Sequence, residues 1–298
     1  MLEAGVEDAF GRPAFVGLER AAKELGIKGR VLTPSPREGF LPAFSSLARQ
    51  AYDLAIGVGA FQAEAIDAAA VKFPQTKFAI IDARRADLEH KPKNVSGLVF
   101  KEQEVGYLAG YLAARMERER EGRAVVSSVG GARTASVERY IAGYQAGARR
   151  ANPEVVLLNR YANDFFDPAK CRAVALDQIA KGSGVVFQAA GACGLGALQA
   201  AGEQGVWGIG VDADQSFLGP HILTSAVKRM DVAVFTIIRD LQEGVFRSGA
   251  DSLLSLANGG VALGSISPKV PRELLAELDE IRSQITSGRI KGIPTSPT

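Results

Sequence analysis

The sequence has little of the side-chain chemistry from which metal sites and disulfide scaffolds are built. Its 298 residues include only two cysteines, Cys171 and Cys193, and two histidines, His90 and His221. So few cysteines exclude a disulfide-rich scaffold, and no residue spacing typical of a metal site occurs. One disulfide is possible, but two unpaired, partly buried thiols are the favoured interpretation. We expect neither a metal nor a cofactor.

Long apolar runs and an excess of charge are also missing. No apolar run reaches the roughly 18 residues that a transmembrane helix needs. The 35 basic and 33 acidic residues leave a net charge of +2, which gives no reason to expect nucleic acid or an acidic membrane surface as a partner.

The first residues lack the features of a signal peptide. Met1 is followed almost at once by Glu3, Glu7 and Asp8, whereas a signal peptide has a basic start and an apolar centre. The segment MLEAG at 1–5 resembles the end of a first strand. We therefore expect an exported protein whose leader is removed, or a start site placed too late.

Motifs of common catalytic and nucleotide sites are absent as well. There is no G-x-S-x-G, and neither histidine lies in a glycine-framed turn, so Ser/His/Asp catalysis is poorly supported. The run GACGLG at 191–196 has the glycine order G-x-x-G-x-G, which differs from the dinucleotide fingerprint G-x-G-x-x-G. We interpret its glycines as a tight strand-to-helix turn that lets a ligand approach closely, rather than as a phosphate loop.

Short apolar strands alternate with amphipathic helices along the chain, which predicts parallel sheets covered by helices on both faces. The expected strands lie at 30–33, 53–60 (with a glycine turn at its end), 77–82, 95–100, 124–129, 155–159, 185–187, 206–211 and 260–263. The expected helices include 44–51, 63–73, 102–117, 136–149, 231–244 and 271–286, together with one that starts at Pro168, is capped by Asp167 and runs to Lys181.

Two carboxylates, Asp212 and Asp214, follow the strand at 206–211. In open α/β sheets, ligands bind outside the carboxyl ends of the strands. Two carboxylates offer too few oxygens for calcium, but they could form a general acid/base pair or serve only as turn residues. Hydrogen bonding to ligand hydroxyls is the preferred interpretation.

Aromatic residues also occur in loops after predicted strands, where core packing does not demand them. They are Phe10, Phe61, Phe165 and Phe166. Stacking of a base on an aromatic ring contributes about 1–3 kcal/mol, so one ring from each lobe would form a clamp for a flat ligand. Lys228 precedes a helix, and position alone would make it a solvated side chain.

Six motifs extend these observations along nearly the whole chain. They are FKEQEVGYLAGYLAA (100–114), GYQAGARRANP (143–153), DPAK (167–170), FQAAGACGLG (187–196), WGIGVDADQ (207–215) and LTSAVKR (223–229). Together they resemble the basic membrane protein family of solute-binding proteins, which includes purine nucleoside receptors of ABC transporters. The resemblance implies an α/β protein of the type I periplasmic-binding-protein fold, with two doubly wound lobes, three chain crossings and a ligand cleft between the lobes. The first lobe would comprise 1–101 and 226–258, and the second 102–225 and 259–298.

Family positions that bind the sugar match three residues of this sequence. The resemblance implies that Asp212 and Lys228 hold the ribose hydroxyls and that Gly191 lines the sugar pocket.

Family positions that bind the base match the sequence less completely. Phe10 and Phe165 would sandwich the base, and Asp82 would lie near it. Members usually carry D-x-G-x-x-D-x-S-F-N near the start, but here Glu3 replaces the first aspartate and Gly11 stands where asparagine is usual. An amide that could read the base edge is therefore absent.

The function that the resemblance implies is binding of a nucleoside for an ABC importer, without catalysis. The implied partners are the nucleoside and the permease subunits, with no nucleic acid, and the membrane would be reached only through a lipid anchor absent from this chain. The implied location is the cell surface or the periplasm. A cytoplasmic ligand-sensing regulator of the same fold is the alternative, and a nucleoside-cleaving enzyme would need an acid or metal that the sequence does not provide.

Overall fold

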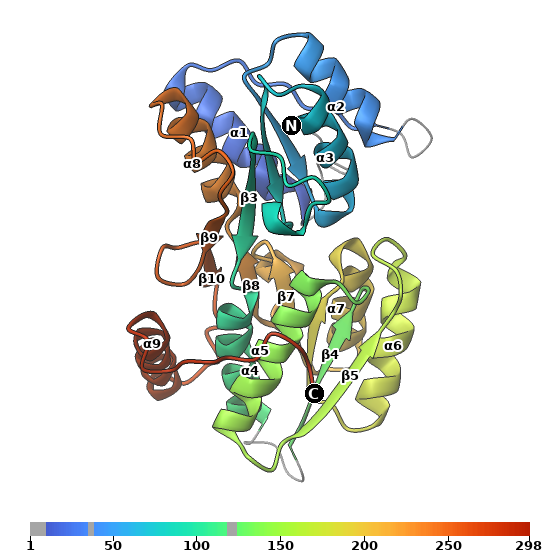
Figure 1. Cartoon of the computed structure of the whole chain (residues 1–298). Coiled ribbons are helices and arrows are strands. Elements are labelled where there is room, and N and C mark those ends of the chain that lie inside the picture. Colours follow the sequence, from blue (N-terminus) through green and yellow to red (C-terminus); the bar gives the residue numbers. More distant parts are fainter. Residues whose placement is uncertain (1–9, 35–38, 118–123) are drawn as a thin grey trace. The chain divides into compact units, whose positions relative to one another are not determined.

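Figure 1 shows a computed structural model of the chain, which describes residues 10–34, 39–117 and 124–298. The chain forms two compact units. The first comprises Met1–Phe100 and Arg229–Leu254, and the second comprises Lys101–Lys228 and Ser255–Thr298. The backbone therefore passes from one unit to the other three times. The predicted end of a first strand at 1–5 lies outside the described residues.

The first unit is built on a parallel sheet with the strand order β1-β2-β3-β9. Its strands are β1 (Leu54–Val58), β2 (Lys77–Ile81), β3 (Val95–Phe100) and β9 (Ser252–Leu254). Its helices are α1 (Gly11–Leu25), α2 (Phe40–Arg49), α3 (Ala63–Lys72) and α8 (Met230–Gln242), with short 3-10 turns η1 (Ala60–Gln62) and η2 (Arg85–Asp87). Helix α1 packs against α8, and α2 packs against α3. Because helices cover the sheet, β3 is buried along its whole length.

The second unit has a six-stranded sheet in the order β10-β8-β7-β6-β4-β5, in which only β10 runs antiparallel to its neighbour among the described strands. Its strands are β4 (Val125–Gly130), β5 (Val156–Tyr161), β6 (Val185–Ala189), β7 (Trp207–Asp212), β8 (Ile222–Lys228) and β10 (Val261–Leu263). Its helices are α4 (Glu102–Glu117), α5 (Ala135–Ala151), α6 (Pro168–Ala180), α7 (Gly194–Glu203) and α9 (Arg272–Thr286), with 3-10 turns η3 (Gly191–Cys193) and η4 (Ser216–Leu218).

Helices α4 and α5 pack backbone against backbone through glycines. A Cβ atom on Gly106 or Gly110 of α4 would overlap the main chain of α5, and a Cβ on Gly143 or Gly147 of α5 would overlap the main chain of α4. Glycine lowers the stability of an isolated helix. Its presence at these four positions is explained by the close approach of the two helices. This contact places the first turn of α4 beside the first turns of α5.

Most predicted elements are confirmed, and the exceptions are short. Residues 30–33 do not form a strand, and only Leu32 makes an isolated bridge. The three-residue strand β9 is not apparent from the sequence, because so short a segment shows no periodicity. The helix cap is as predicted: the Asp167 side chain accepts a hydrogen bond from the Ala169 amide, and Pro168 begins α6.

The expectation of two unpaired thiols is wrong. Cys171 and Cys193 form a disulfide, with a Cα–Cα distance of 5.5 Å, and both residues are fully buried. The two cysteines are 22 residues apart in the sequence. Because β5 and β6 both pair in parallel with β4, the segments that follow β5 and β6 lie at the same edge of the sheet, and these segments carry Cys171 and Cys193.

None of the helices within the described residues is both long and apolar enough to cross a lipid bilayer. This agrees with the sequence, in which apolar runs are short.

The α4–α5 contact predicts that replacing Gly110 by alanine destabilises the second unit. The new Cβ would overlap the Tyr144 carbonyl oxygen, and overpacking of this kind costs about 1–3 kcal/mol. Urea unfolding of the variant measures the effect. Gly202→Ala in α7 is the control, because its Cβ would meet only the half-buried His221 ring, at 3.0 Å, which can move aside. Equal loss in both variants would contradict the packing argument.

Candidate functional site

The carboxyl ends of β7 and β8 place Asp212 and Lys228 at the same edge of the sheet in the second unit. Asp212 is the last residue of β7 and pairs in register with Val227, so Lys228 is the next residue along β8. Asp212 is 6% exposed and has a positive φ of 65°, a backbone conformation that is uncommon for a residue other than glycine. The two residues predicted to hold ribose are thus brought together.

Tyr140 of α5 lies between these two side chains. Its hydroxyl donates a hydrogen bond to Asp212 Oδ1 at 3.3 Å, and Lys228 Nζ lies 5.6 Å from the centre of its ring. The ring packs edge-on against Phe187 of β6, with centroids 6.2 Å apart. This packing fixes the tyrosine, so that its hydroxyl orients the Asp212 carboxylate.

Lys228 is 1% exposed, so it is not the solvated side chain that its position alone suggested. Its Nζ donates a hydrogen bond to Ser136 Oγ at 2.8 Å and forms an ion pair with Glu102 Oε1 at 3.1 Å. A buried ammonium is retained only when it is paired and hydrogen-bonded. Glu102 and Ser136 supply that environment.

Glu102, the first residue of α4, has no exposed surface and accepts from two cations. Arg139 Nε donates to its Oε2 at 2.5 Å, and Ser136 Oγ donates to its Oε1 at 2.8 Å. Burial opposes ionisation of the carboxyl, but the nearby charges of Lys228 and Arg139 outweigh it and hold the pKa of Glu102 below its ordinary value of 4.5. Glu102 is therefore ionised at neutral pH.

Asp214 is used within the protein and not as an acid/base partner of Asp212. Its Oδ2 accepts hydrogen bonds from the Ser265 amide at 3.0 Å and the Ser265 hydroxyl at 2.5 Å, and its Oδ1 accepts from the Ser216 amide at 3.0 Å. Burial opposes its ionisation, but these hydrogen bonds lower the pKa of Asp214. The turn-residue interpretation therefore fits Asp214.

Phe165 and Gly191 lie side by side in the second unit. The Cys193 amide donates to the Phe165 carbonyl at 2.9 Å, and a Cβ on Gly191 would lie 3.3 Å from that same oxygen. Gly191 has a φ of 57°, which a side chain would strain. Phe165 is partly buried, and its ring fills the space beside Gly131, where a Cβ would overlap it.

The other glycines of the run at 191–196 serve close packing. A Cβ on Gly194 would overlap the Gln188 side chain, and one on Gly196 would overlap the Pro168 carbonyl oxygen. These contacts explain the glycines without a bound phosphate, in agreement with the interpretation of the run as a tight turn.

The predicted residues of the first unit lie at the ends of two elements. Phe10 precedes α1 and is partly buried, and Gly11 is the first residue of α1 and buried. Asp82 follows β2, donates its amide to the Leu98 carbonyl at 3.1 Å and has a φ of 67°. The φ of Asp82, just after β2, is therefore nearly the same as the φ of Asp212 at the end of β7.

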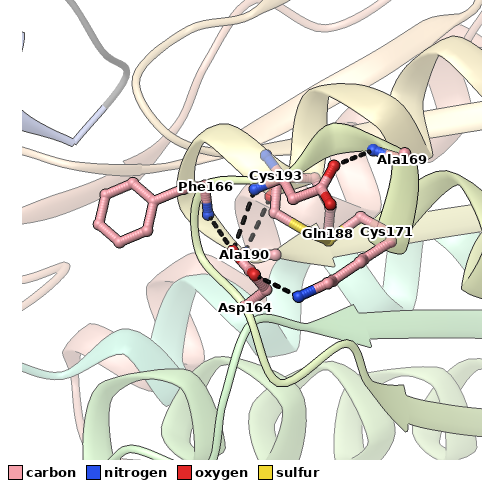
Figure 2. The surroundings of a disulfide bond; sticks show 9 residues. Asp164, Phe166, Ala169, Cys171, Gln188, Ala190 and Cys193 are labelled. Carbon is pink, nitrogen blue, oxygen red and sulfur yellow. Dashed lines mark hydrogen bonds and ion pairs between the residues drawn. A yellow bond between two sulfur atoms is a disulfide. The ribbon is translucent and has the colours of Figure 1, made fainter.

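The remaining loop phenylalanines are exposed. Phe61 is 58% exposed and packs against Phe40, with ring centroids 5.5 Å apart. Phe166 is 71% exposed, and in Figure 2 its ring points away from the disulfide. Neither residue belongs to the Asp212–Tyr140–Lys228 group.

One group of three potential metal ligands occurs within the described residues: Asp67, Glu89 and His90, in the first unit. Asp67 Oδ2 accepts a hydrogen bond from His90 Nδ1 at 2.7 Å. That hydrogen bond and the charge of Asp67 raise the pKa of His90. The arrangement is explained as an ordinary histidine–carboxylate pair.

Sequence reasoning missed Glu102, Ser136 and Tyr140. All three lie on helices, whereas ligand-binding residues were expected at the ends of strands. Glu102 does not stand out in the sequence, because Glu104 and Glu117 of the same helix are buried as well.

Comparisons with known proteins agree with this fold. Residues 4–294 match the family model described as ABC transporter substrate-binding protein PnrA-like. A CD4+ T-cell-stimulating antigen of Listeria innocua is 30% identical over 316 residues, covering 98% of this chain and 86% of the relative. The ABC transporter nucleoside-binding protein BmpA of Lactococcus lactis is 30% identical over 309 residues, covering 96% and 85%.

A solved structure shows the same architecture. The ABC transporter solute-binding protein from Aeropyrum pernix K1 is 26% identical, with a TM-score of 0.86, and the match covers 98% of this chain and 92% of that one. The fold is therefore the type I periplasmic-binding-protein fold, as expected from the sequence motifs.

The buried Glu102 predicts a pH-dependent contribution to stability. Glu102→Gln leaves Lys228 and Arg139 without their anion, so we expect a loss of about 3–5 kcal/mol in the free energy of unfolding at pH 7. Because the pKa of Glu102 is lowered in the folded state, the wild type holds this stability above pH 4.5 and loses it as the pH falls through the folded pKa. The difference in the free energy of unfolding between wild type and variant should therefore become smaller in acid.

Urea unfolding between pH 3 and pH 7 measures the gap. Glu280→Gln is the control, because Glu280 is exposed and its ion pair with Arg289 spans 3.5 Å at the surface, where such pairs contribute little. A constant gap across the pH range would refute the role given to Glu102.

Proposed function

The chain belongs to the PnrA-like family of ABC transporter substrate-binding proteins, and we propose that it is a receptor for a nucleoside. Members of this family bind substrates and are not enzymes. The observation that supports the proposal most directly is the group formed by Asp212, Tyr140 and Lys228 at the strand ends of the second unit. A buried carboxylate held by a hydroxyl, with a buried cation nearby, suits the hydroxyl pair of a sugar.

Recognition of ribose would use the charge of Asp212. Hydrogen bonds to charged groups contribute about 1.5–3 kcal/mol each, and Asp212 is already desolvated at 6% exposure. The Tyr140 hydroxyl fixes the carboxylate in advance, so little ordering remains for the ligand to impose. Lys228 would donate to the same sugar, and Gly191 would let the sugar approach the backbone.

Recognition of the base would use aromatic stacking. Phe165 in the second unit and Phe10 in the first unit are the two rings that we assign to this task, and stacking contributes about 1–3 kcal/mol per ring. Asp82 would hydrogen-bond to the base. Gly11 provides no side chain where the family usually has an amide, so we propose that base discrimination rests on Asp82 and on stacking.

The disulfide supports a location outside the cytoplasm. Disulfides form and persist in oxidising compartments and are rare in the cytosol of most organisms, and Cys171 is bonded to Cys193. This observation favours a receptor at the cell surface or in the periplasm over a cytoplasmic regulator. A lipid anchor upstream of this chain and docking to ABC permease subunits complete the proposal.

Transport would depend on a ligand-driven change between two states. A ligand shifts a conformational equilibrium only by the difference in its affinity for the two states. In this proposal, the nucleoside binds one of the two states more tightly, and the permease recognises that state.

The ribose assignment predicts a selective effect of Asp212→Asn. Asparagine tolerates the positive φ of this position, but it removes the charge that grips the hydroxyls. We expect at least a tenfold loss of affinity for a riboside, which corresponds to about 1.4 kcal/mol, and little change for the free base. Calorimetry with inosine, guanosine, adenosine, uridine and the corresponding bases measures both.

Asp214→Asn is the matched control, because Asp214 bonds to Ser216 and Ser265 and not to Tyr140. Equal losses for riboside and base in Asp212→Asn would show that the sugar lies elsewhere. If the wild type binds none of the nucleosides more tightly than about 100 µM, roughly 5.5 kcal/mol, the nucleoside proposal fails.

A further inference from the structure

We propose that the Cys171–Cys193 disulfide positions the ligand-binding loops of the second unit. The inference rests on the proposed function, because it assigns the crosslink to the segments that carry Phe165 and Gly191. Figure 2 shows the disulfide with its surroundings. Cys171 lies in the first part of α6 and Cys193 is the last residue of η3, so the bond joins the two segments that follow β5 and β6.

One end of the crosslink is continuous with the Gly191 turn. Gly191 and Cys193 are the first and last residues of η3, and the Cys193 amide itself donates to the Phe165 carbonyl at 2.9 Å. The Gln188 side chain accepts from the Ala190 amide at 3.0 Å and holds the preceding residue. Cys193 therefore supplies both a sulfur of the disulfide and the amide that holds Phe165 in position.

The other end is continuous with the Phe165 loop. Asp164 accepts hydrogen bonds from the Phe166 amide at 2.7 Å and the Asp167 amide at 3.0 Å, and pairs with Lys170 Nζ at 2.7 Å. The hydrogen bond from Lys170 and the hydrogen bonds from those two amides hold the pKa of Asp164 far below its ordinary value. These contacts hold residues 164–170 in one conformation, and Cys171 follows directly after this segment.

The disulfide should raise ligand affinity because it excludes conformations of the two segments that differ from the ligand-bound one. Without it, the two segments are held together by hydrogen bonds and by the apolar cluster around Cys171, Cys193 and Val186. Segments held only in this way open locally more often. A ligand that contacts both segments would then have to order them, and that ordering lowers its affinity.

Reduction of the bond supplies the chemical test. A dithiol reductant gives two electrons and two protons: the sulfur–sulfur bond breaks, Cys171 and Cys193 become thiols, and the reductant closes into a cyclic disulfide. Both cysteines are fully buried, so reduction requires the two segments to separate. A nucleoside that contacts both segments should shift the equilibrium with dithiothreitol toward the disulfide, by the same factor by which reduction lowers the affinity of the protein for that nucleoside.

The experiment compares the oxidised wild type, the reduced wild type and the double variant Cys171→Ala/Cys193→Ala. We expect a loss of affinity of about fivefold or more in both altered proteins, for the free base as well as for the riboside, because Phe165 is assigned to the base. Val186→Ala is the control: it removes volume from the same apolar cluster but leaves the bond intact. Unchanged affinity without the bond, or equal losses with Val186→Ala, would overturn the inference.

A second measurement separates failure of this inference from failure of the proposed function. Hydrogen exchange of the Phe166 and Cys193 amides reports on the two segments without any ligand. We expect faster exchange of both amides in the double variant, while amides in α4 keep the wild-type rate. If the wild type binds no nucleoside, the proposed function fails, and exchange alone then decides whether the bond braces the segments. Wild-type exchange rates in the double variant reject the bracing.

Discussion

The contact between α4 and α5 determines the geometry of the proposed sugar site. Because Gly106, Gly110, Gly143 and Gly147 have no side chains, the two helices approach backbone to backbone. The first turn of α4 then presents Glu102 to residues from the start of α5 and to the end of β8. The same helix α5 carries Tyr140 one turn further on, against Phe187 and Asp212. A side chain on any of the four glycines would separate these groups.

The charges that this packing brings together are equal in number and opposite in sign. Glu102 pairs with both Lys228 and Arg139, and Tyr140 links Lys228 to Asp212, so two carboxylates accompany two cations. Burying such a cluster contributes little net stability, because desolvation offsets the attraction, whereas removing one member is costly. The cluster instead fixes the positions of two side chains. An ionised Glu102 holds Lys228 in place, and the Tyr140 hydroxyl holds Asp212. In the proposed function, both groups would therefore bind a sugar without first reorganising.

Strand ends and one cap were predictable from the sequence, and contacts between distant elements were not. The apolar strands, the cap at Asp167 and the position of Asp212 follow from local patterns, because each depends on neighbouring residues. The roles of Tyr140 and Glu102 depend on how helices pack, which periodicity does not encode. The disulfide was missed for the same reason: 22 residues separate Cys171 from Cys193, and their segments meet because β5 and β6 both pair with β4.

The backbone at two aspartates provides an independent argument for a ligand role. Asp82 and Asp212 occupy corresponding places in the two units, just after or at the end of a parallel strand, with φ values of 67° and 65°. Glycine would adopt this conformation without strain, and asparagine would adopt it readily. A conformation that costs free energy persists where it serves an arrangement, often at a binding site. A carboxylate at both positions, where glycine would fold more easily, suits the proposed site, in which Asp82 and Asp212 would accept hydrogen bonds from donor groups of the ligand.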